Sequence, residues 1–296
     1  MEMHALKCQD PNCVSFITSK IDSVYQNGDV EPIRIVVPSD NRPVIVYFAE
    51  GSKFILIKCG NKDCSSGNKK TVIVDQQDYS TSLDNRFDVA IGKDDLPIVM
   101  FGAAPDSHVL KCDNSDCTQF HVGLTLIGKT PSRQPSITIG QDGNPIFSFV
   151  ESSLALRTVK CQMIDCSGPV IESLHPTPYD VVNQTIVVPP DGIPLIAYTE
   201  YQGQLYALKC GTPSCAGGQD TITVLGTSPV SEFSKSGTNT MPLVNGTTPV
   251  ITYRTYSQST FHLDVITCVN YACTNFTSVQ DVHTSPYGWV SQMIKS

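Results

Sequence analysis

The sequence predicts an all-β protein built from repeated four-stranded antiparallel sheets, and three observations support this prediction. Cysteines occur in six pairs, and each pair encloses four residues. Ahead of five of the pairs, a proline opens an apolar run in which the fourth residue after the proline is aromatic. The first cysteines of successive pairs lie 51, 53, 49, 49 and 58 residues apart. One unit therefore recurs along the whole chain.

Each period contains four candidate strands, as the fourth period illustrates. Residues 184–188 form the first strand, and a turn at 190–193 leads into a second strand at 194–199. A third strand is expected at 204–210 and a fourth at 221–225. Val, Ile, Thr, Tyr and Phe fill these runs, and Gly, Pro, Asn and Asp separate them, which is typical of strands joined by tight turns.

Several strands are apolar on both faces, as in residues 44–48 and 54–57. Sheets that are covered on both sides have this pattern. Four-stranded units that need cover on both faces can pack radially as the blades of a propeller. We therefore predict a six-bladed β-propeller of four-stranded antiparallel blades, with an open solenoid of stacked sheets as the alternative architecture.

The predicted blades follow one another within a single domain that spans residues 1–296. Complete blades are expected at residues 32–75, 84–128, 135–174, 183–226 and 239–282. Residues 1–27 supply only the third and fourth strands of a blade, and residues 284–296 align with a first strand. The closing blade is thus a composite of the N- and C-termini that lacks its second strand. We expect that strand to come from residues outside this sequence or from a neighbouring chain, because its absence would leave backbone groups unpaired.

The cysteine pairs predict disulfides, because each pair brackets a tight turn that joins two adjacent strands. Zinc is the less favoured alternative, since the six histidines follow no matching spacing. The expected bonds are Cys8–Cys13, Cys59–Cys64, Cys112–Cys117, Cys161–Cys166, Cys210–Cys215 and Cys268–Cys273. Such a set indicates an oxidising compartment, and we expect a secreted, extracellular or cell-surface protein.

Three glycosylation triplets agree with that location, at Asn183, Asn245 and Asn275. The first residues of the sequence do not form a signal peptide, so we expect a processed or partial piece of a longer secreted polypeptide. The net charge of −8 and the pI near 5.1 argue against a nucleic-acid partner. No apolar run reaches the roughly 18 residues of a membrane helix, so membrane insertion is not expected.

A lysine precedes the first cysteine in five of the six pairs, at Lys7, Lys58, Lys111, Lys160 and Lys209. We interpret this position as a solvated one that protects a sheet edge from association, in preference to a cationic ring for anionic polymers. Aspartates in the turns before the prolines, such as Asp142 and Asp191, are expected to cap their own backbone.

These residues resemble a repeat found in secreted and predicted bacterial, protist and metagenomic β-propeller proteins. The repeat has the form Asp-Gly-x-Pro-hydrophobic-x-x-Tyr followed by Leu-x-x-Lys-Cys-x-x-x-x-Cys, and the match covers essentially the whole chain. The resemblance implies an extracellular propeller and carries no catalytic set to transfer.

Catalytic signatures are not found in the sequence, and we expect no enzyme activity, no cofactor and no metal site. It contains neither Gly-x-Ser-x-Gly nor His-Glu-x-x-His nor a phosphate-binding glycine loop. Candidates for ligand binding are an aromatic platform of Tyr179, Tyr287 and Trp289, and the loop residue Arg133. Packing within the loops is the more common role of such residues.

The predicted function is an extracellular structural or interaction module, as a subunit of a surface or filamentous assembly or as part of a longer secreted chain. The expected partners are further copies of the chain or neighbouring domains, and glycans are possible ligands. The alternative is a carbohydrate-binding, lectin-like propeller, and the third hypothesis is a glycosidase or lyase.

Overall fold

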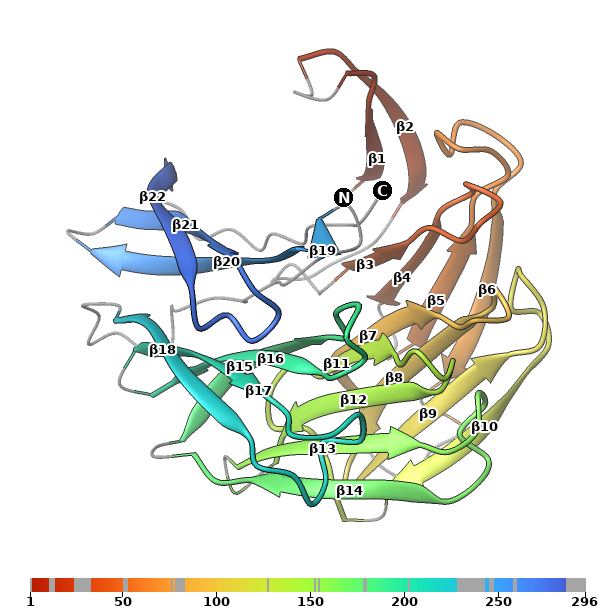
Figure 1. Cartoon of the computed structure of the whole chain (residues 1–296). Helices are drawn as coiled ribbons and strands as arrows, with labels where there is room; N and C mark the ends of the chain where they lie inside the picture. The colour runs from red at the N-terminus through yellow and green to blue at the C-terminus, as the bar shows by residue number, and fades with distance from the viewer. Residues whose placement is uncertain are drawn as a thin grey trace. The chain divides into compact units, whose positions relative to one another are not determined.

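The computed structural model describes residues 2–10, 14–23, 33–49, 53–75, 77, 83–126, 128–151, 153, 155–177, 180–201, 203–227, 243–244, 248–257 and 260–285. The regular secondary structure that these residues form consists of β-strands (Figure 1). No helix among them is long and apolar enough to cross a membrane. The chain divides into two compact units, Met1–Gly128 and Lys129–Ser296, which are described separately below.

The first unit contains a two-stranded sheet and two four-stranded antiparallel sheets. The two-stranded sheet pairs β1 (Glu2–Cys8) with β2 (Phe16–Ser23). The next sheet consists of β3 (Ile33–Val36), β4 (Val44–Ala49), β5 (Lys53–Lys58) and β6 (Lys69–Asp75). The third consists of β7 (Leu83–Ile91), β8 (Pro97–Ala103), β9 (Asp106–Cys112) and β10 (Phe120–Leu126).

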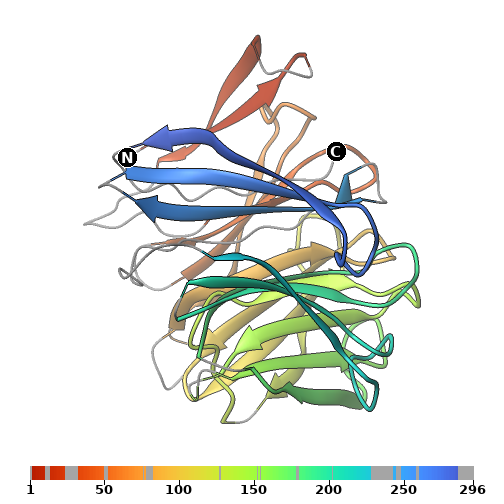
Figure 2. The ribbon, with the colours of Figure 1, turned by 60° about the vertical axis from the view of Figure 1, so that its left-hand side comes forward.

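The second unit contains three four-stranded antiparallel sheets (Figures 1 and 2). The first consists of β11 (Ser136–Ile139), β12 (Pro145–Val150), β13 (Leu156–Cys161) and β14 (Val170–His175). The second consists of β15 (Val181–Val187), β16 (Leu195–Glu200), β17 (Gln204–Lys209) and β18 (Thr221–Thr227). The third consists of β19 (Leu243–Val244), β20 (Thr248–Ser257), β21 (Thr260–Cys268) and β22 (Phe276–Ser285).

All five four-stranded sheets are meanders, in which each strand pairs with the next one along the chain. They span residues 33–75, 83–126, 136–175, 181–227 and 243–285. The two inner strands of each sheet carry the core. For example, β8 is buried along its whole length, as its apolar sequence on both faces predicts.

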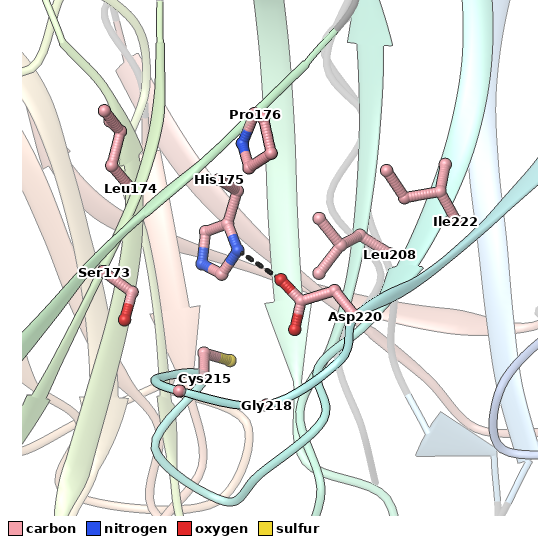
Figure 3. A pocket seen from close by; sticks show the side chains of 10 residues that line it. Ser173, Leu174, His175, Pro176, Leu208, Cys215, Gly218, Asp220 and Ile222 are labelled. Atoms are coloured by element: carbon pink, nitrogen blue, oxygen red, sulfur yellow. Dashed lines mark hydrogen bonds and ion pairs between the residues drawn. The ribbon is translucent and has the colours of Figure 1, made fainter.

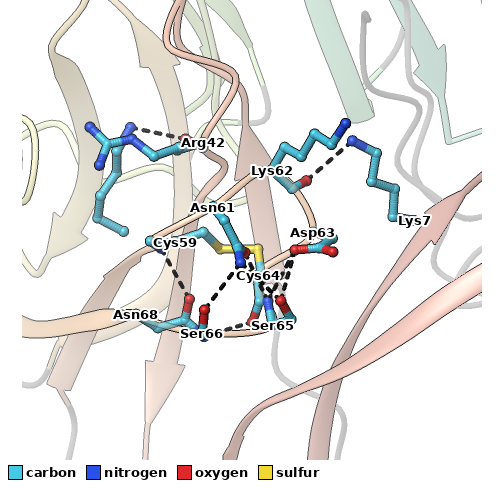
Figure 4. The surroundings of a disulfide bond; sticks show 12 residues. Lys7, Arg42, Cys59, Asn61, Lys62, Asp63, Cys64, Ser65, Ser66 and Asn68 are labelled. Carbon is cyan, nitrogen blue, oxygen red and sulfur yellow. Dashed lines mark hydrogen bonds between the residues drawn. A yellow bond between two sulfur atoms is a disulfide. The ribbon is translucent and has the colours of Figure 1, made fainter.

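Five predicted disulfides are present, at Cys59–Cys64, Cys112–Cys117, Cys161–Cys166, Cys210–Cys215 and Cys268–Cys273. Their Cα–Cα distances lie between 4.7 and 5.1 Å. Cys8 is also disulfide-bonded, and its predicted partner Cys13 lies outside the described residues. Each bond closes the hairpin between the third and fourth strands of a sheet, and Figure 4 shows the hairpin of Cys59–Cys64 with its internal hydrogen bonds.

The lysines before four of these cysteines are buried, so their interpretation as solvated edge residues was wrong. Lys58, Lys111, Lys160 and Lys209 are each 8% exposed or less. Each ammonium forms an ion pair with the aspartate of the turn between the first and second strands of its own sheet. The pairs are Lys58–Asp40, Lys111–Asp94, Lys160–Asp142 and Lys209–Asp191. We call this pair the lysine clamp.

The lysine clamp also includes a backbone carbonyl of the same turn. Lys160 Nζ donates to Asp142 Oδ1 at 2.6 Å and to the carbonyl of Asn144 at 2.9 Å. The same carboxylate accepts the backbone N–H of Asn144, so the predicted self-capping by Asp142 is present as well. Buried ammonium groups need such partners, because an unpaired charge in a core is strongly destabilising.

Candidate functional site

A pocket of about 370 Å³ lies between the sheets β11–β14 and β15–β18, both of which belong to the second unit. The strand β14 and the residue after it supply one wall, and β17, β18 and the hairpin between them supply the other (Figure 3). Its lining residues are Ser173, Leu174, His175, Pro176, Leu208, Cys215, Gly217, Gly218, Asp220 and Ile222. The pocket therefore combines an apolar wall with one carboxylate and one imidazole.

A chain of hydrogen bonds fixes the carboxylate of the pocket. His175 Nδ1 donates to Asp220 Oδ2 at 2.8 Å, and the two groups face each other in Figure 3. The other ring nitrogen of His175, Nε2, lies 2.9 Å from the hydroxyl of Thr158. The backbone N–H of Gly211 donates to Asp220 Oδ1 at 3.0 Å. The imidazole is 2% exposed, whereas the Asp220 side chain is 22% exposed. Within this series of hydrogen-bonded groups, the carboxylate is therefore the group that a ligand can reach.

The order carboxylate, imidazole, hydroxyl is also the order of hydrolytic triads. Here the hydroxyl belongs to Thr158, which is completely buried in the strand β13. A substrate cannot approach a nucleophile at that depth, so the arrangement holds Asp220 in place and does not form a reactive centre.

The hairpin that carries Asp220 folds back closely upon itself. Gly211 and Gly218 approach each other so tightly that a Cβ on Gly218 would lie 2.7 Å from the backbone of Gly211. Since real Cβ atoms do not approach backbone this closely, both positions require glycine. The disulfide Cys210–Cys215 holds the same hairpin, and Cys215 lines the pocket. This local structure presents the N–H of Gly211 to Asp220.

Parts of the polar chain differ from the other repeats. The position of His175 pairs with the residue four places before the clamp lysine, and it is Val74 in β3–β6, Leu126 in β7–β10 and Gly226 in β15–β18. In β19–β22 the same position is again a histidine, His283, which pairs with Leu263. Thr158 stands two places before the clamp lysine Lys160. The other sheets that have a clamp lysine have Leu56, Val109 and Ala207 at this position. The signal that sequence reasoning missed was therefore the hydroxyl of Thr158, a local departure from the repeat.

The strand that carries His175 also differs in register. The pairs β5–β6, β9–β10, β17–β18 and β21–β22 each contain a register shift. The pair β13–β14 has a continuous register from Leu156↔His175 to Cys161↔Val170. A bulge changes the face on which the following side chains lie. The register of β14 therefore differs from that of these four outer strands, although β22 has His283 at the place of His175 despite its register shift.

A corresponding place in the first unit is filled by direct contacts between sheets. There, Lys69 and Thr71 of β6 bond to Asp116 in the hairpin after β9, at 2.8 and 3.0 Å. Thr71 pairs with the residue two places before Lys58, and Ser173 pairs with the residue two places before Lys160. Ser173 therefore takes the position of Thr71, and it lines the pocket. At equivalent positions, Thr71 therefore bridges two sheets of the first unit, whereas Ser173 lines a pocket.

The predicted ligand-binding residues are placed only in part. Tyr179, Tyr287 and Trp289 lie outside the described residues. Arg133 is described and exposed, and its guanidinium donates to the carbonyl of Ser132 at 3.3 Å. The aromatic platform therefore stays a prediction, and Arg133 is not among the residues that line the pocket.

The predicted glycosylation sites differ in exposure. Asn183 is 8% exposed within β15, and its Oδ1 accepts the backbone N–H of Gln184. Asn245 lies outside the described residues. Asn275 is exposed and follows the hairpin that Cys268–Cys273 closes. A glycan could therefore be attached to its side-chain amide without disrupting the packing of a sheet.

Comparison with known proteins shows likeness in structure. No protein-family model matches the chain, and no curated protein matches its sequence. A protein of unknown function from Dyadobacter fermentans has a TM-score of 0.61 and 8% identity, over 87% of this chain and 84% of that one. A mutant of AofleA from Arthrobotrys oligospora has a TM-score of 0.57 and 10% identity, over 84% of this chain and 70% of that one.

A third structure of the same fold is a lectin. The Aleuria aurantia lectin in complex with Fucα1-6GlcNAc has a TM-score of 0.55 and 7% identity, over 88% of this chain and 80% of that one. Glycoside hydrolases of family 43 are also among the similar structures. The chain thus has an all-β fold of repeated four-stranded antiparallel sheets, of the β-propeller type that these lectins and hydrolases share. Because one fold serves both classes, function must be argued from the site.

Proposed function

We propose that this protein is an extracellular carbohydrate-binding β-propeller of six blades, and that the pocket between β14 and the β17–β18 hairpin binds a sugar residue. The observation that carries the proposal is the pocket itself, in which a fixed carboxylate faces an apolar wall. This proposal favours the lectin-like hypothesis over the structural or filamentous one, for which the described residues offer no specific support.

The chemistry of the pocket fits a pyranose. Sugars present hydroxyl groups at their edges and C–H groups on their faces, so a site for them needs acceptors and apolar surface together. Asp220 supplies two acceptor oxygens. Leu174, Pro176 and Ile222 supply apolar surface. The volume of about 370 Å³ is at the lower end of the range of ligand pockets, which suits a single sugar residue.

The fold and the disulfides agree with this function. Structures that share the fold include the Aleuria aurantia lectin in complex with α-methyl-L-fucoside and with Fucα1-6GlcNAc. Five disulfides within short hairpins are consistent with an extracellular protein. In this proposal the sixth blade combines residues 1–27 with residues 286–296, because Thr284 and Ser285 of the predicted 284–296 segment belong to β22. The platform of Tyr179, Tyr287 and Trp289 is a second place where a glycan could stack.

A glycan array with matched variants tests the proposal. Ile222 lines the pocket and is 43% exposed, whereas Val279 is 59% exposed on the corresponding outer strand β22 and is not a lining residue. We expect Ile222→Ser to weaken glycan binding by about tenfold, the equivalent of 1.4 kcal/mol, and Val279→Ser to leave it unchanged. Both changes replace an exposed edge-strand residue, so they should affect stability alike. No glycan binding by the native chain would contradict the proposal.

The same array separates the two candidate sites. Binding that survives Ile222→Ser and disappears on alanine substitution of Tyr287 and Trp289 would move the site to the aromatic platform. Release of reducing sugar from a bound glycan would instead favour the glycosidase hypothesis.

A further inference from the structure

We propose that the pocket selects its sugar by charge: it accepts uncharged and amino sugars and rejects sugars that carry a carboxylate, such as uronic and sialic acids. This inference rests on the proposed function and adds the chemical class of the ligand. It follows from the role of Asp220, which the hairpin does not need as a charged residue.

The corresponding residue of another sheet shows what the hairpin requires. Asn68 occupies the place of Asp220 in the sheet β3–β6, where its Oδ1 accepts the backbone N–H of Gly60 at 3.2 Å. Asp220 Oδ1 accepts the N–H of Gly211 at 3.0 Å in the same way. An uncharged amide therefore closes this hairpin, and the negative charge at Asp220 is surplus to that structural task.

The charge of Asp220 is fixed at the pocket, and the imidazole of His175 is the one basic group among the lining residues. Its second oxygen accepts from His175 Nδ1, which directs the carboxylate into the space between the sheets. Neither lysine nor arginine occurs among the ten lining residues. A ligand carboxylate in this pocket would face a like charge in partly desolvated surroundings and would have no ammonium or guanidinium to pair with.

Uncharged hydroxyl groups of a ligand are attracted by the carboxylate of Asp220. The oxygens of Asp220 can each accept a further hydrogen bond, and hydrogen bonds to an ionised acceptor are stronger than those between neutral groups. The ammonium of an amino sugar would gain a charge-assisted bond at the same place. We therefore expect affinity to decrease in the order amino sugar, neutral sugar, uronic acid for a common ring configuration.

Titration calorimetry with sugars of matched configuration tests this order. The probes are the methyl glycosides of glucose, glucosamine and glucuronic acid, and the corresponding three of the galactose series, each added to the full chain. We expect the uronic acid of the preferred series to bind at least about tenfold more weakly than the neutral sugar. In Asp220→Asn this ratio should fall to about twofold or less, because the repulsion is removed while the amide still closes the hairpin as Asn68 does.

The control is Asp165→Asn, which removes a carboxylate from the neighbouring hairpin of Cys161–Cys166, outside the pocket. This variant should keep the full discrimination. Two results would overturn the inference and leave the proposed function standing. One is equal affinity of the native chain for neutral and uronic sugars, and the other is a neutral-to-uronic affinity ratio in Asp220→Asn that is as large as in the native chain. Failure of the native chain to bind any of the probes or any arrayed glycan would overturn the proposed function itself.

Discussion

Four buried lysines show how single residues stabilise each repeat. In each case the ammonium pairs with a turn aspartate and with a carbonyl of that turn, so it ties the first turn of a sheet to its third strand. Burial lowers the pKa of Lys209, and the hydrogen bond from its ammonium to Asp191 opposes that shift. The sequence showed both residues in register, but it did not show that they touch, because contact depends on how the turn folds over the strand.

Replacement of a clamp lysine should destabilise the protein. We expect Lys160→Met to lower the free energy of unfolding by about 1–2 kcal/mol, because charge-assisted hydrogen bonds are lost while the half-exposed Asp142 regains water. Lys7 has the same place in the first repeat, but it is only partly buried, and its ammonium donates to the backbone carbonyl of Lys62 at 3.4 Å (Figure 4). Lys7→Met should therefore change the free energy of unfolding by less than about 0.5 kcal/mol. Urea denaturation measures both. An unchanged midpoint for Lys160→Met would show that the clamp contributes no net stability.

The clamp also predicts a dependence of stability on pH. Burial raises the pKa of Asp142, but hydrogen bonds from Lys160 and the N–H of Asn144 outweigh that effect, so the pKa lies below its usual value. A carboxyl with a lowered pKa in the folded state stabilises the protein above its unfolded pKa of about 4, and this contribution is lost as the pH falls through the folded value. The urea midpoint of the native chain should therefore fall more steeply on acidification below about pH 4 than that of Lys160→Met. Parallel curves would contradict this explanation.

At the scale of elements, each disulfide hairpin ends on a residue with unusual backbone geometry. The second cysteine has a positive φ in all five described bonds, at Cys64, Cys117, Cys166, Cys215 and Cys273, with values between 52° and 59°. Only glycine adopts this region without cost. The bond and the backbone are therefore coupled, since cysteine is kept at a position that would otherwise favour glycine.

That coupling predicts a difference between two double variants. Removal of the bond in Cys161→Ala/Cys166→Ala should lower stability by about 2 kcal/mol, as expected for a loop of this length. Cys161→Ala/Cys166→Gly loses the same bond but relieves the left-handed strain, and it should be more stable than the alanine pair by about 1 kcal/mol. Thermal unfolding of the two variants measures the difference. Equal midpoints would mean that the hairpin relaxes when the bond is removed.

The elements also explain why the fold was predictable and the pocket was not. The strand positions follow from residues that recur in every period, such as the prolines and the cysteine pairs, so their signal is repeated five or six times. The pocket depends on Thr158 and His175 of the sheet β11–β14 and on Asp220 of the next sheet, so its residues belong to two successive repeats. A single sequence offers no periodic signal for such a combination. A search for departures from the repeat would have identified Thr158, where the other sheets with a clamp lysine have an apolar residue.

At the scale of the molecule, the proposed six-bladed ring makes a prediction about its closing blade. Among the described strands, β1 pairs with β2 alone, and an isolated two-stranded sheet is marginally stable in water. If residues 286–296 complete this blade, a chain that ends at Ser285 should show faster amide hydrogen exchange in β1 and β2, with exchange in β15–β18 unchanged. Hydrogen exchange with mass spectrometry measures both regions. Unchanged protection of β1 and β2 would contradict the composite blade.

The lysine clamp lies wholly within one sheet, and this has a consequence for how such a chain can evolve. A duplicated repeat brings both the cation and the anion of its clamp with it, so a new copy needs no adjustment by its neighbours to neutralise a buried charge. The last repeat has Thr267 in place of the lysine and Gly246 in place of the aspartate, so both halves are missing together. A pair that is gained or lost as one unit leaves the surfaces between sheets free to differ, and His175 and Asp220 lie at one of these surfaces.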